Sequence, residues 1–129
     1  MKGRIISRGK AEAEALTTTQ PVSFYGGVDP NTGIVIEKGH ELQGQSVKGK
    51  ILVFPQGKGS TVGSYTLYRL KASHRAPLAI VNAECEPITA VGCIIAEIPC
   101  LDQVTLEFLK SGQTLVVDAG AGIVEIIEE

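Results

Sequence analysis

A glycine-rich loop that carries a serine and a lysine is the part of the sequence best suited to chemistry. Residues 55–64 read PQGKGSTVGS. Glycines let main-chain N–H groups come close to a bound group, and unpaired N–H groups at a helix start attract anions. Lys58 adds a positive charge and Ser60 a hydroxyl. The residue types therefore point to anion binding, or to a hydroxyl that accepts a proton once amides and a cation stabilise its alkoxide.

The spelling of this loop excludes three common sites. A phosphate-binding P-loop needs GxxxxGK[ST], a dinucleotide site GxGxxG and a nucleophile elbow GxSxG. Gly57, Gly59 and Gly63 give GxGxxxG, and the lysine precedes the second glycine. A simpler role stays open, in which Ser60 or Thr61 caps the following helix and contributes about 1 kcal/mol to its stability.

The loop must be held by the elements on either side of it. The run KILVF at residues 50–54, apolar after its first residue, predicts a buried strand. Apolar residues three positions apart predict a helix over residues 61–73. Residues 77–81 predict a second buried strand. This strand–helix–strand unit has the length of a right-handed crossover between parallel strands.

The rest of the chain adds strands and one more helix. Helix is predicted over residues 87–98, although its second half would also suit a strand, and residues 10–16 fit a half-buried strand or a helix. Residues 104–109 are ambiguous. Further strands are predicted over residues 3–7, 34–36, 113–118 and 122–127, the last two as a hairpin. We expect the α/β class, or α+β as the alternative, with a mixed, barrel-like sheet and helices packed outside it.

Other polar residues are candidates for the same cleft. Residues 23–33 form a long turn region with Gly26, Gly27 and Asp29, which is either a second loop at the cleft or a well-made turn. Ser64, one helical turn beyond Ser60, is placed to assist it. Residues 84–86 follow a strand end, where sites form in α/β folds.

Length, charge and cysteine usage narrow the class of protein. The 129 residues predict one domain, residues 1–129, and 43% are hydrophobic, which is enough for a core. The formal net charge is -2 and the basic residues are scattered, so we expect no nucleic-acid partner. No segment has the roughly 18–20 apolar residues of a membrane helix, and the N-terminus lacks a signal-peptide core, so we expect a cytoplasmic protein that binds no membrane. The spacing of Cys85, Cys93 and Cys100 fits no zinc or redox motif and predicts buried or half-buried free thiols and no metal site.

The chain resembles the small, swivelling-domain subunit of the aconitase X family. The motifs that carry the resemblance are weak singly but specific in combination. They are SFYGGVDPNTG at 23–33, GHELQGQSVKGKILVFPQGKGSTVGSYTLYRL at 39–70, PLAIVNAECEPITAVGCIIAEIP at 77–99 and VDAGAGIVEI at 117–126.

The resemblance implies a cytoplasmic hydro-lyase made of two polypeptides, as a heterodimer or larger assembly. The large subunit, a separate chain, is expected to carry an iron–sulfur cluster and much of the substrate site. This chain is expected to be a β/β/α swivelling domain that covers the cleft and binds no cofactor. The implied reaction removes water from (R)-5-phosphomevalonate, a phosphorylated hydroxy acid, to give trans-anhydromevalonate 5-phosphate in a modified mevalonate route to isoprenoids.

The resemblance also assigns roles within the loop. In the family the first serine of the glycine loop is taken as the proton acceptor, and Ser60 occupies that position. Lys58 stands where the branch that acts on hydroxyproline tends to have arginine, which favours the phosphomevalonate branch. A hydroxyproline-type substrate and a non-catalytic, anion-binding regulatory domain remain alternatives. The residues expected to bind substrate are Gly57, Lys58, Gly59, Thr61, Gly26, Gly27 and Asp29.

Overall fold

The strand–loop–helix–strand unit around the glycine loop forms as the sequence predicts. In the computed structural model, which describes residues 1–129, the unit consists of β3 (Ile51–Phe54), α1 (Gly63–Ala72) and β4 (Ala79–Asn82). β3 and β4 are parallel, with Ile51 opposite Ala79 and Phe54 opposite Asn82. The glycine loop therefore leaves the carboxyl end of a central strand.

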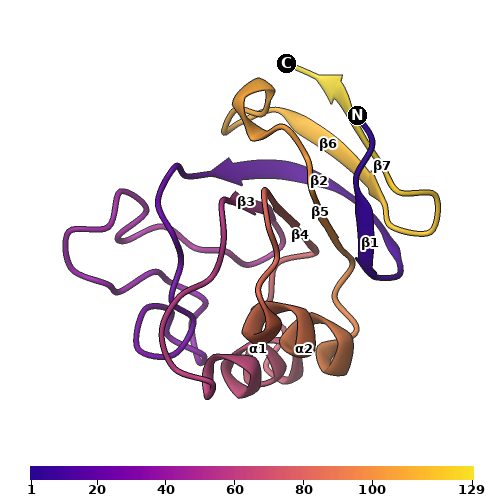
Figure 1. Cartoon of the computed structure of the whole chain (residues 1–129). Coiled ribbons are helices and arrows are strands. Elements are labelled where there is room, and N and C mark those ends of the chain that lie inside the picture. The colour runs from indigo at the N-terminus through magenta and orange to yellow at the C-terminus, as the bar shows by residue number, and fades with distance from the viewer.

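One seven-stranded sheet curves through the molecule (Figure 1). Its order is β1-β5-β4-β3-β2-β6-β7, and the strands from β5 to β2 run parallel. β1 pairs with β5 antiparallel at one end, and the β6–β7 hairpin pairs with β2 antiparallel at the other. The remaining strands are β1 (Arg4–Ser7), β2 (Lys10–Thr17), β5 (Cys100–Asp102), β6 (Thr114–Asp118) and β7 (Ile123–Glu128).

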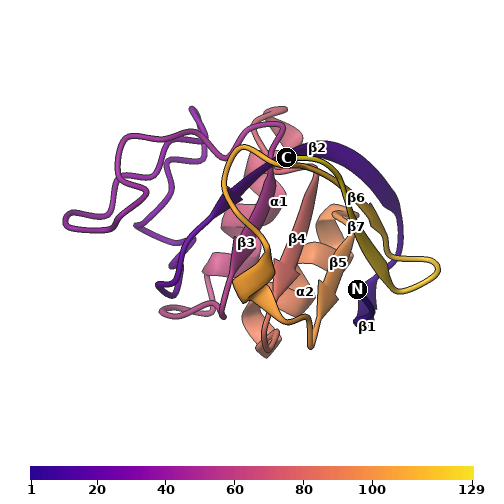
Figure 2. The ribbon, with the colours of Figure 1, turned by 90° about the horizontal axis from the view of Figure 1, so that it is seen from above.

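Two apolar cores lie on the two faces of this sheet. α1 and α2 (Pro87–Ala96) lie side by side on one face (Figures 1 and 2). There Leu52 and Phe54 of β3 belong to one apolar cluster with Leu67 and Leu70 of α1. The strongly curved β6–β7 end folds over the other face, onto a second cluster that includes Val53. Because β3 is buried on both faces, its sequence is continuously apolar rather than alternating.

The predicted class, a mixed barrel-like sheet with helices outside, is confirmed, and several open points are decided. Residues 10–16 form a strand and not a helix, and the second half of residues 87–98 stays helical. α2 ends where Glu97 adopts a left-handed conformation with φ 55°. Residues 104–109 contain a short 3-10 helix, η1 (Leu106–Phe108).

One predicted strand does not form, and one strand was not predicted. Residues 34–36 make only isolated bridges, because Val35 is buried while Ile34 and Ile36 point outward and no sheet strand lies beside them. β5 was not predicted, because its three residues are too short to show a pattern. The two α-helices have ten residues each, and neither has the length and apolar character needed to cross a membrane.

Candidate functional site

Two glycines allow the loop after β3 to follow its path. Gly59 has φ +95°, a conformation that side chains disfavour. Gly57 is buried against the first turn of α2, where an added Cβ would overlap Oε1 of Glu86 and Oγ1 of Thr89. The loop is thus pinned onto α2 at its start, and it reaches the surface at Gly59 and Ser60.

The Ser60 hydroxyl is exposed and lies just before α1. Its Oγ accepts a hydrogen bond from the Val62 N–H at 3.1 Å, and its carbonyl oxygen accepts one from the Gly63 N–H at 2.9 Å. The N–H groups of Gly59, Ser60 and Thr61 donate to no backbone oxygen. Three consecutive donors and a hydroxyl are therefore presented together at the surface, in the arrangement that attracts an anion.

The alternative role left open for Ser60 or Thr61, as the cap of α1, is not observed. α1 begins at Gly63, its N-cap residue is Val62, and no side chain caps it. Ser60, Thr61 and Val62 form one extra turn before regular helix begins. The Ser60 hydroxyl stabilises this turn and not the helix itself.

Lys58 is held by Glu37, which no local sequence pattern marks as its partner. Its Nζ lies 2.9 Å from Oε2 of Glu37, and its backbone N–H donates to the carbonyl oxygen of Val22 at 3.0 Å. The side chains of Lys58 and Glu37 are 47% and 28% exposed. The ammonium is therefore available at the surface, with its charge partly balanced by one carboxylate.

The structure brings the two predicted glycine loops together. They enclose a shallow cavity of about 410 Å³ that is lined by Ser23, Tyr25, Gly26, Gly27, Glu37, Lys58 and Gly59. An added Cβ at Gly59 would lie 2.7 Å from Oγ of Ser23, and one at Gly27 would overlap the carbonyl oxygen of Ser23. Ser23 is thus the contact between the loops, and no local sequence signal marks it as such.

Other predicted residues lie outside this cavity. Asp29 Oδ1 accepts a hydrogen bond from the Asn31 N–H at 2.8 Å and so stabilises its own turn. Thr61 lines a separate groove between the starts of α1 and α2. Ser64 is buried and donates to the carbonyl oxygen of Ile88 at 2.6 Å, so the expectation that it assists Ser60 is wrong.

Glu86 lies directly beneath the glycine loop. Its carboxylate caps α2, accepting hydrogen bonds from the N–H groups of Ile88 at 2.8 Å and Thr89 at 3.0 Å. Both carboxylate oxygens are thus used in the cap, which leaves Glu86 a structural support for Gly57. Glu84 is exposed and makes no side-chain hydrogen bond or ion pair.

The three cysteines are free, as predicted, and do not fit an iron–sulfur cluster. Cys93 and Cys100 are buried and Cys85 is half-buried, with 4.0 Å between the Sγ atoms of Cys85 and Cys100. The hydrogen bond with Cys100, together with burial, raises the pKa of the Cys85 thiol. No group of three or more His, Cys, Asp or Glu side chains is placed to hold a metal ion.

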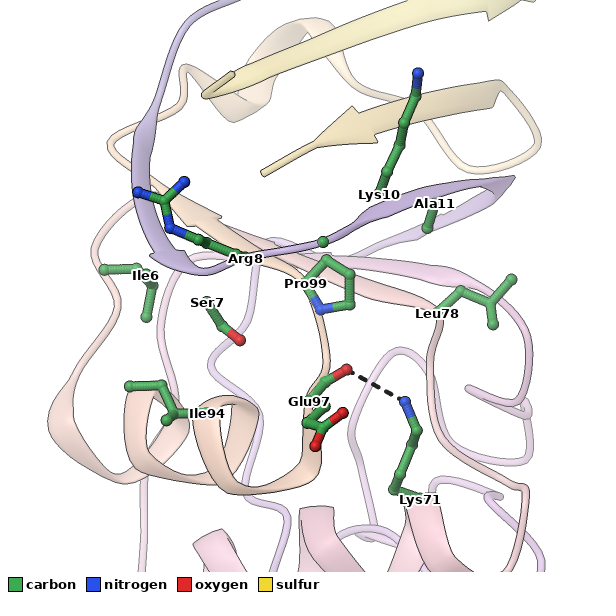
Figure 3. Close-up of a pocket in the computed structure, with 11 residues that line it drawn as sticks. Ile6, Ser7, Arg8, Lys10, Ala11, Lys71, Leu78, Ile94, Glu97 and Pro99 are labelled. Carbon is green, nitrogen blue, oxygen red and sulfur yellow. Dashed lines mark hydrogen bonds between the residues drawn. The ribbon is translucent and has the colours of Figure 1, made fainter. Parts of the chain in front are cut away.

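A larger cavity, of about 830 Å³, lies near the C-terminal ends of the two helices (Figure 3). Lys71, at the end of α1, donates to the carbonyl oxygen of Glu97 at 3.2 Å there. The side chains of Arg8 and Lys10 point in different directions and do not converge on a ligand position (Figure 3). None of the predicted site residues lines this cavity.

The curved mixed sheet, with two helices on one face and a glycine loop between β3 and α1, defines a swivel-type β/β/α domain. The chain belongs to the aconitase X swivel domain family, whose sequence pattern matches residues 1–126. The resemblance predicted from the sequence is therefore confirmed.

Relatives and a solved structure agree with this assignment. The chain is 56% identical over 131 aligned residues to the phosphomevalonate dehydratase small subunit of Methanosarcina mazei, covering 99% of this chain and 91% of that one. It is 54% identical to the phosphomevalonate dehydratase small subunit of Thermococcus kodakarensis, covering 100% and 97%. The crystal structure of Thermococcus kodakaraensis aconitase X in its holo-form superposes with a TM-score of 0.97 at 54% identity, covering 98% and 97% of the two chains. The names of these relatives confirm the prediction of a dehydratase subunit.

Proposed function

We propose that this chain is the small subunit of a two-chain dehydratase that converts (R)-5-phosphomevalonate to trans-anhydromevalonate 5-phosphate. Support comes from the relatives, which are named phosphomevalonate dehydratase small subunits and align over almost the whole chain. The reaction belongs to a modified mevalonate route to isoprenoids. The partner is a large subunit, with which this chain forms a heterodimer or a larger assembly.

Ser60 is the proton acceptor in this proposal. The observation that carries it is the exposed Ser60, whose Oγ accepts a hydrogen bond from the Val62 N–H at 3.1 Å. The neighbouring N–H groups of residues 59–61 donate to no backbone oxygen. A serine hydroxyl is a poor base unless its alkoxide is stabilised. Oriented amide dipoles at the start of α1 stabilise negative charge at this position, and the nearby Lys58 adds to the effect.

The proton chemistry follows from this placement. Ser60 first loses its hydroxyl proton to solvent water; the resulting alkoxide then removes a proton from the carbon next to the substrate carboxylate and becomes a hydroxyl again, which returns that proton to solvent before the next turnover. The electron pair of that C–H bond forms the C=C bond, and the C–O bond to the neighbouring carbon breaks as hydroxide leaves. This chain places no acid for the leaving hydroxide. We propose that the large subunit supplies that group and holds the iron–sulfur cluster implied by the family.

The substrate's anionic groups have a matching surface on this chain. The cavity between the glycine loops offers the ammonium of Lys58 next to Gly26, Gly27 and Gly59, with the free N–H of Gly59 at its edge. We propose that it receives the phosphate or the carboxylate. Gly57 and Thr61 flank this position, and Asp29 keeps the shape of the second loop.

The test is an assay of the two chains expressed together. Ser60→Ala is expected to leave folding and pairing intact and to lower kcat by about 100-fold or more, because a positioned base contributes roughly that much. Ser46→Ala is a matched control, because Ser46 Oγ accepts the Lys48 N–H at 3.2 Å in the same local geometry away from the site. Near-normal turnover by Ser60→Ala would refute the role of Ser60. Turnover of hydroxyproline but not of 5-phosphomevalonate would favour the alternative substrate. Turnover of neither compound would favour a non-catalytic regulatory domain.

A further inference from the structure

α2 has an outer face that its own chain does not cover. None of its ten residues, PITAVGCIIA, is charged. Val91, Ile94 and Ile95 are 49%, 56% and 45% exposed. A helix on the surface of a soluble domain normally carries polar residues on its outer face, and a helix that is apolar all round is normally buried. The composition of α2 therefore indicates a helix that is buried in an assembly.

This apolar surface continues to the glycine loop. A groove of about 390 Å³ separates the first turns of α1 and α2, and Val62, Tyr65, Ile88 and Val91 line it. Thr61, the neighbour of Ser60, lies at its edge. Tyr65 is 68% exposed, so a large aromatic side chain stands at the mouth of the groove.

Polar residues lie at the edge of this apolar surface, as they do around protein interfaces. At the far end of α2, Ile94 lines the cavity that also contains the cationic side chains of Arg8 and Lys71 (Figure 3). An apolar centre with a polar rim is typical of surfaces that bind other proteins, and contiguous apolar patches are uncommon on surfaces that stay exposed. We call this surface the α2 face and define it by Val62, Tyr65, Ile88, Val91, Ile94 and Ile95.

We propose that the α2 face is the docking surface for the large subunit. The inference rests on the proposed function, because a proton acceptor at Ser60 can act on a ligand held by another polypeptide only if the surface around it meets that polypeptide. The α2 face adjoins Ser60 through Thr61 and Val62, so docking there brings the partner to the loop. The partner is expected to place an apolar side chain in the groove between α1 and α2.

The experiment measures pairing rather than turnover. Val91→Asp and Ile94→Asp place a charge at two exposed positions one turn apart, where folding of the isolated chain is expected to survive. Each is expected to weaken binding to the co-expressed large subunit by about 30-fold or more, because a buried, unpaired charge at an interface centre is strongly unfavourable. Phe108→Asp is the matched control, since Phe108 is 60% exposed on η1, which packs on the opposite side of the sheet. Circular dichroism and thermal unfolding of each isolated variant confirm its fold.

The outcomes separate this proposal from the proposed function. Loss of pairing in the α2 variants with normal pairing in Phe108→Asp supports it, even if the wild-type complex proves inactive on 5-phosphomevalonate. Wild-type affinity in both α2 variants overturns it, as does an equal loss of pairing in Phe108→Asp. A stable dimer of the isolated chain that Val91→Asp converts to monomer would assign the face to a second copy instead and overturn it. Failure of the wild-type chains to associate would overturn both proposals.

Discussion

The ammonium of Lys58 lies 2.9 Å from the carboxylate of Glu37, and both residues line the cavity between the two glycine loops. The two residues come from loops 21 positions apart in the sequence. Both side chains are partly exposed, and pairs of this kind contribute at most about 1 kcal/mol. The pair therefore positions Lys58 without binding it so strongly that an anion cannot compete for the ammonium.

The first prediction concerns this lysine. Lys58→Ala is expected to raise KM for the phosphorylated substrate by about 10-fold or more, because a charge-assisted hydrogen bond to an anion is lost. Glu37→Gln keeps the ammonium and removes its competing carboxylate, so KM is expected to fall or stay the same. Steady-state kinetics of the complex test both, with Lys48→Ala as a control at an exposed lysine outside the cavity. Unchanged KM and kcat in Lys58→Ala would place the lysine outside the site.

The elements that hold the site could be predicted from the sequence. β3 and β4 show as apolar runs because both of their faces are buried, and the spacing of Leu67 and Leu70 marks the inner face of α1. The glycine at position 59 could be predicted as well, because its positive φ is a local conformation that glycine favours. These features depend on local sequence, which is why local patterns predict them.

Contacts between segments that are distant in the sequence could not be predicted from it. β5 has three residues, and the partner of its fully buried Asp102 is Arg4, 98 positions away. The contact between Ser23 and Gly59 likewise arises only when the chain folds. Such partners carry no local periodicity, so a single sequence predicts that a loop is special but not which residues lie opposite it.

The second prediction concerns acid stability at the β6–β7 turn. Hydrogen bonds from the backbone N–H groups of Ala121 and Gly120, each 3.0 Å from Oδ1 of Asp118, hold the pKa of that carboxyl below its ordinary value. A group whose pKa is lower in the folded state stabilises the fold above its unfolded pKa, and this contribution is lost as pH falls through the folded value. As pH falls below about 4, the ordinary pKa of an aspartate, the wild-type chain is thus expected to lose more stability than Asp118→Asn. Urea unfolding at a series of pH values measures the free energy of unfolding of both proteins. The same dependence of this free energy on pH in the wild-type chain and in Asp118→Asn would contradict the prediction.

The third prediction concerns the half-buried thiol. Because the contact with Cys100 and burial raise the pKa of Cys85, its thiolate is scarce near neutral pH. Cys85 is expected to react with iodoacetamide at pH 7 at least about 10-fold more slowly than a free peptide thiol, whose pKa is about 8.5. Mass spectrometry of the labelled, folded chain locates the modification. Labelling of Cys85 as fast as the peptide reference would show that the thiol is not held in its protonated form.

The fourth prediction compares two buried threonines, of which one has a hydrogen-bond partner for its hydroxyl and the other has none. Thr89 Oγ1 lies beneath Gly57 with no hydrogen-bond partner, whereas Thr66 Oγ1 donates to the carbonyl oxygen of Val62 at 3.3 Å. A buried hydroxyl without a partner costs free energy, and valine has nearly the same shape without the hydroxyl. Thr89→Val is therefore expected to raise the free energy of unfolding by about 1 kcal/mol.

Thr66→Val is the matched control, because it removes a hydroxyl that has a partner. Its expected effect is a loss of about 0.5–1.5 kcal/mol, the usual net value of one hydrogen bond. Chemical denaturation of both variants beside the wild-type chain gives the two differences. Equal destabilisation by the two substitutions would mean that the Thr89 hydroxyl has a partner in solution, such as an ordered water beneath the glycine loop. In that case the floor under Gly57 is a hydrated polar site that supports the loop, and not a dry contact between α2 and the loop.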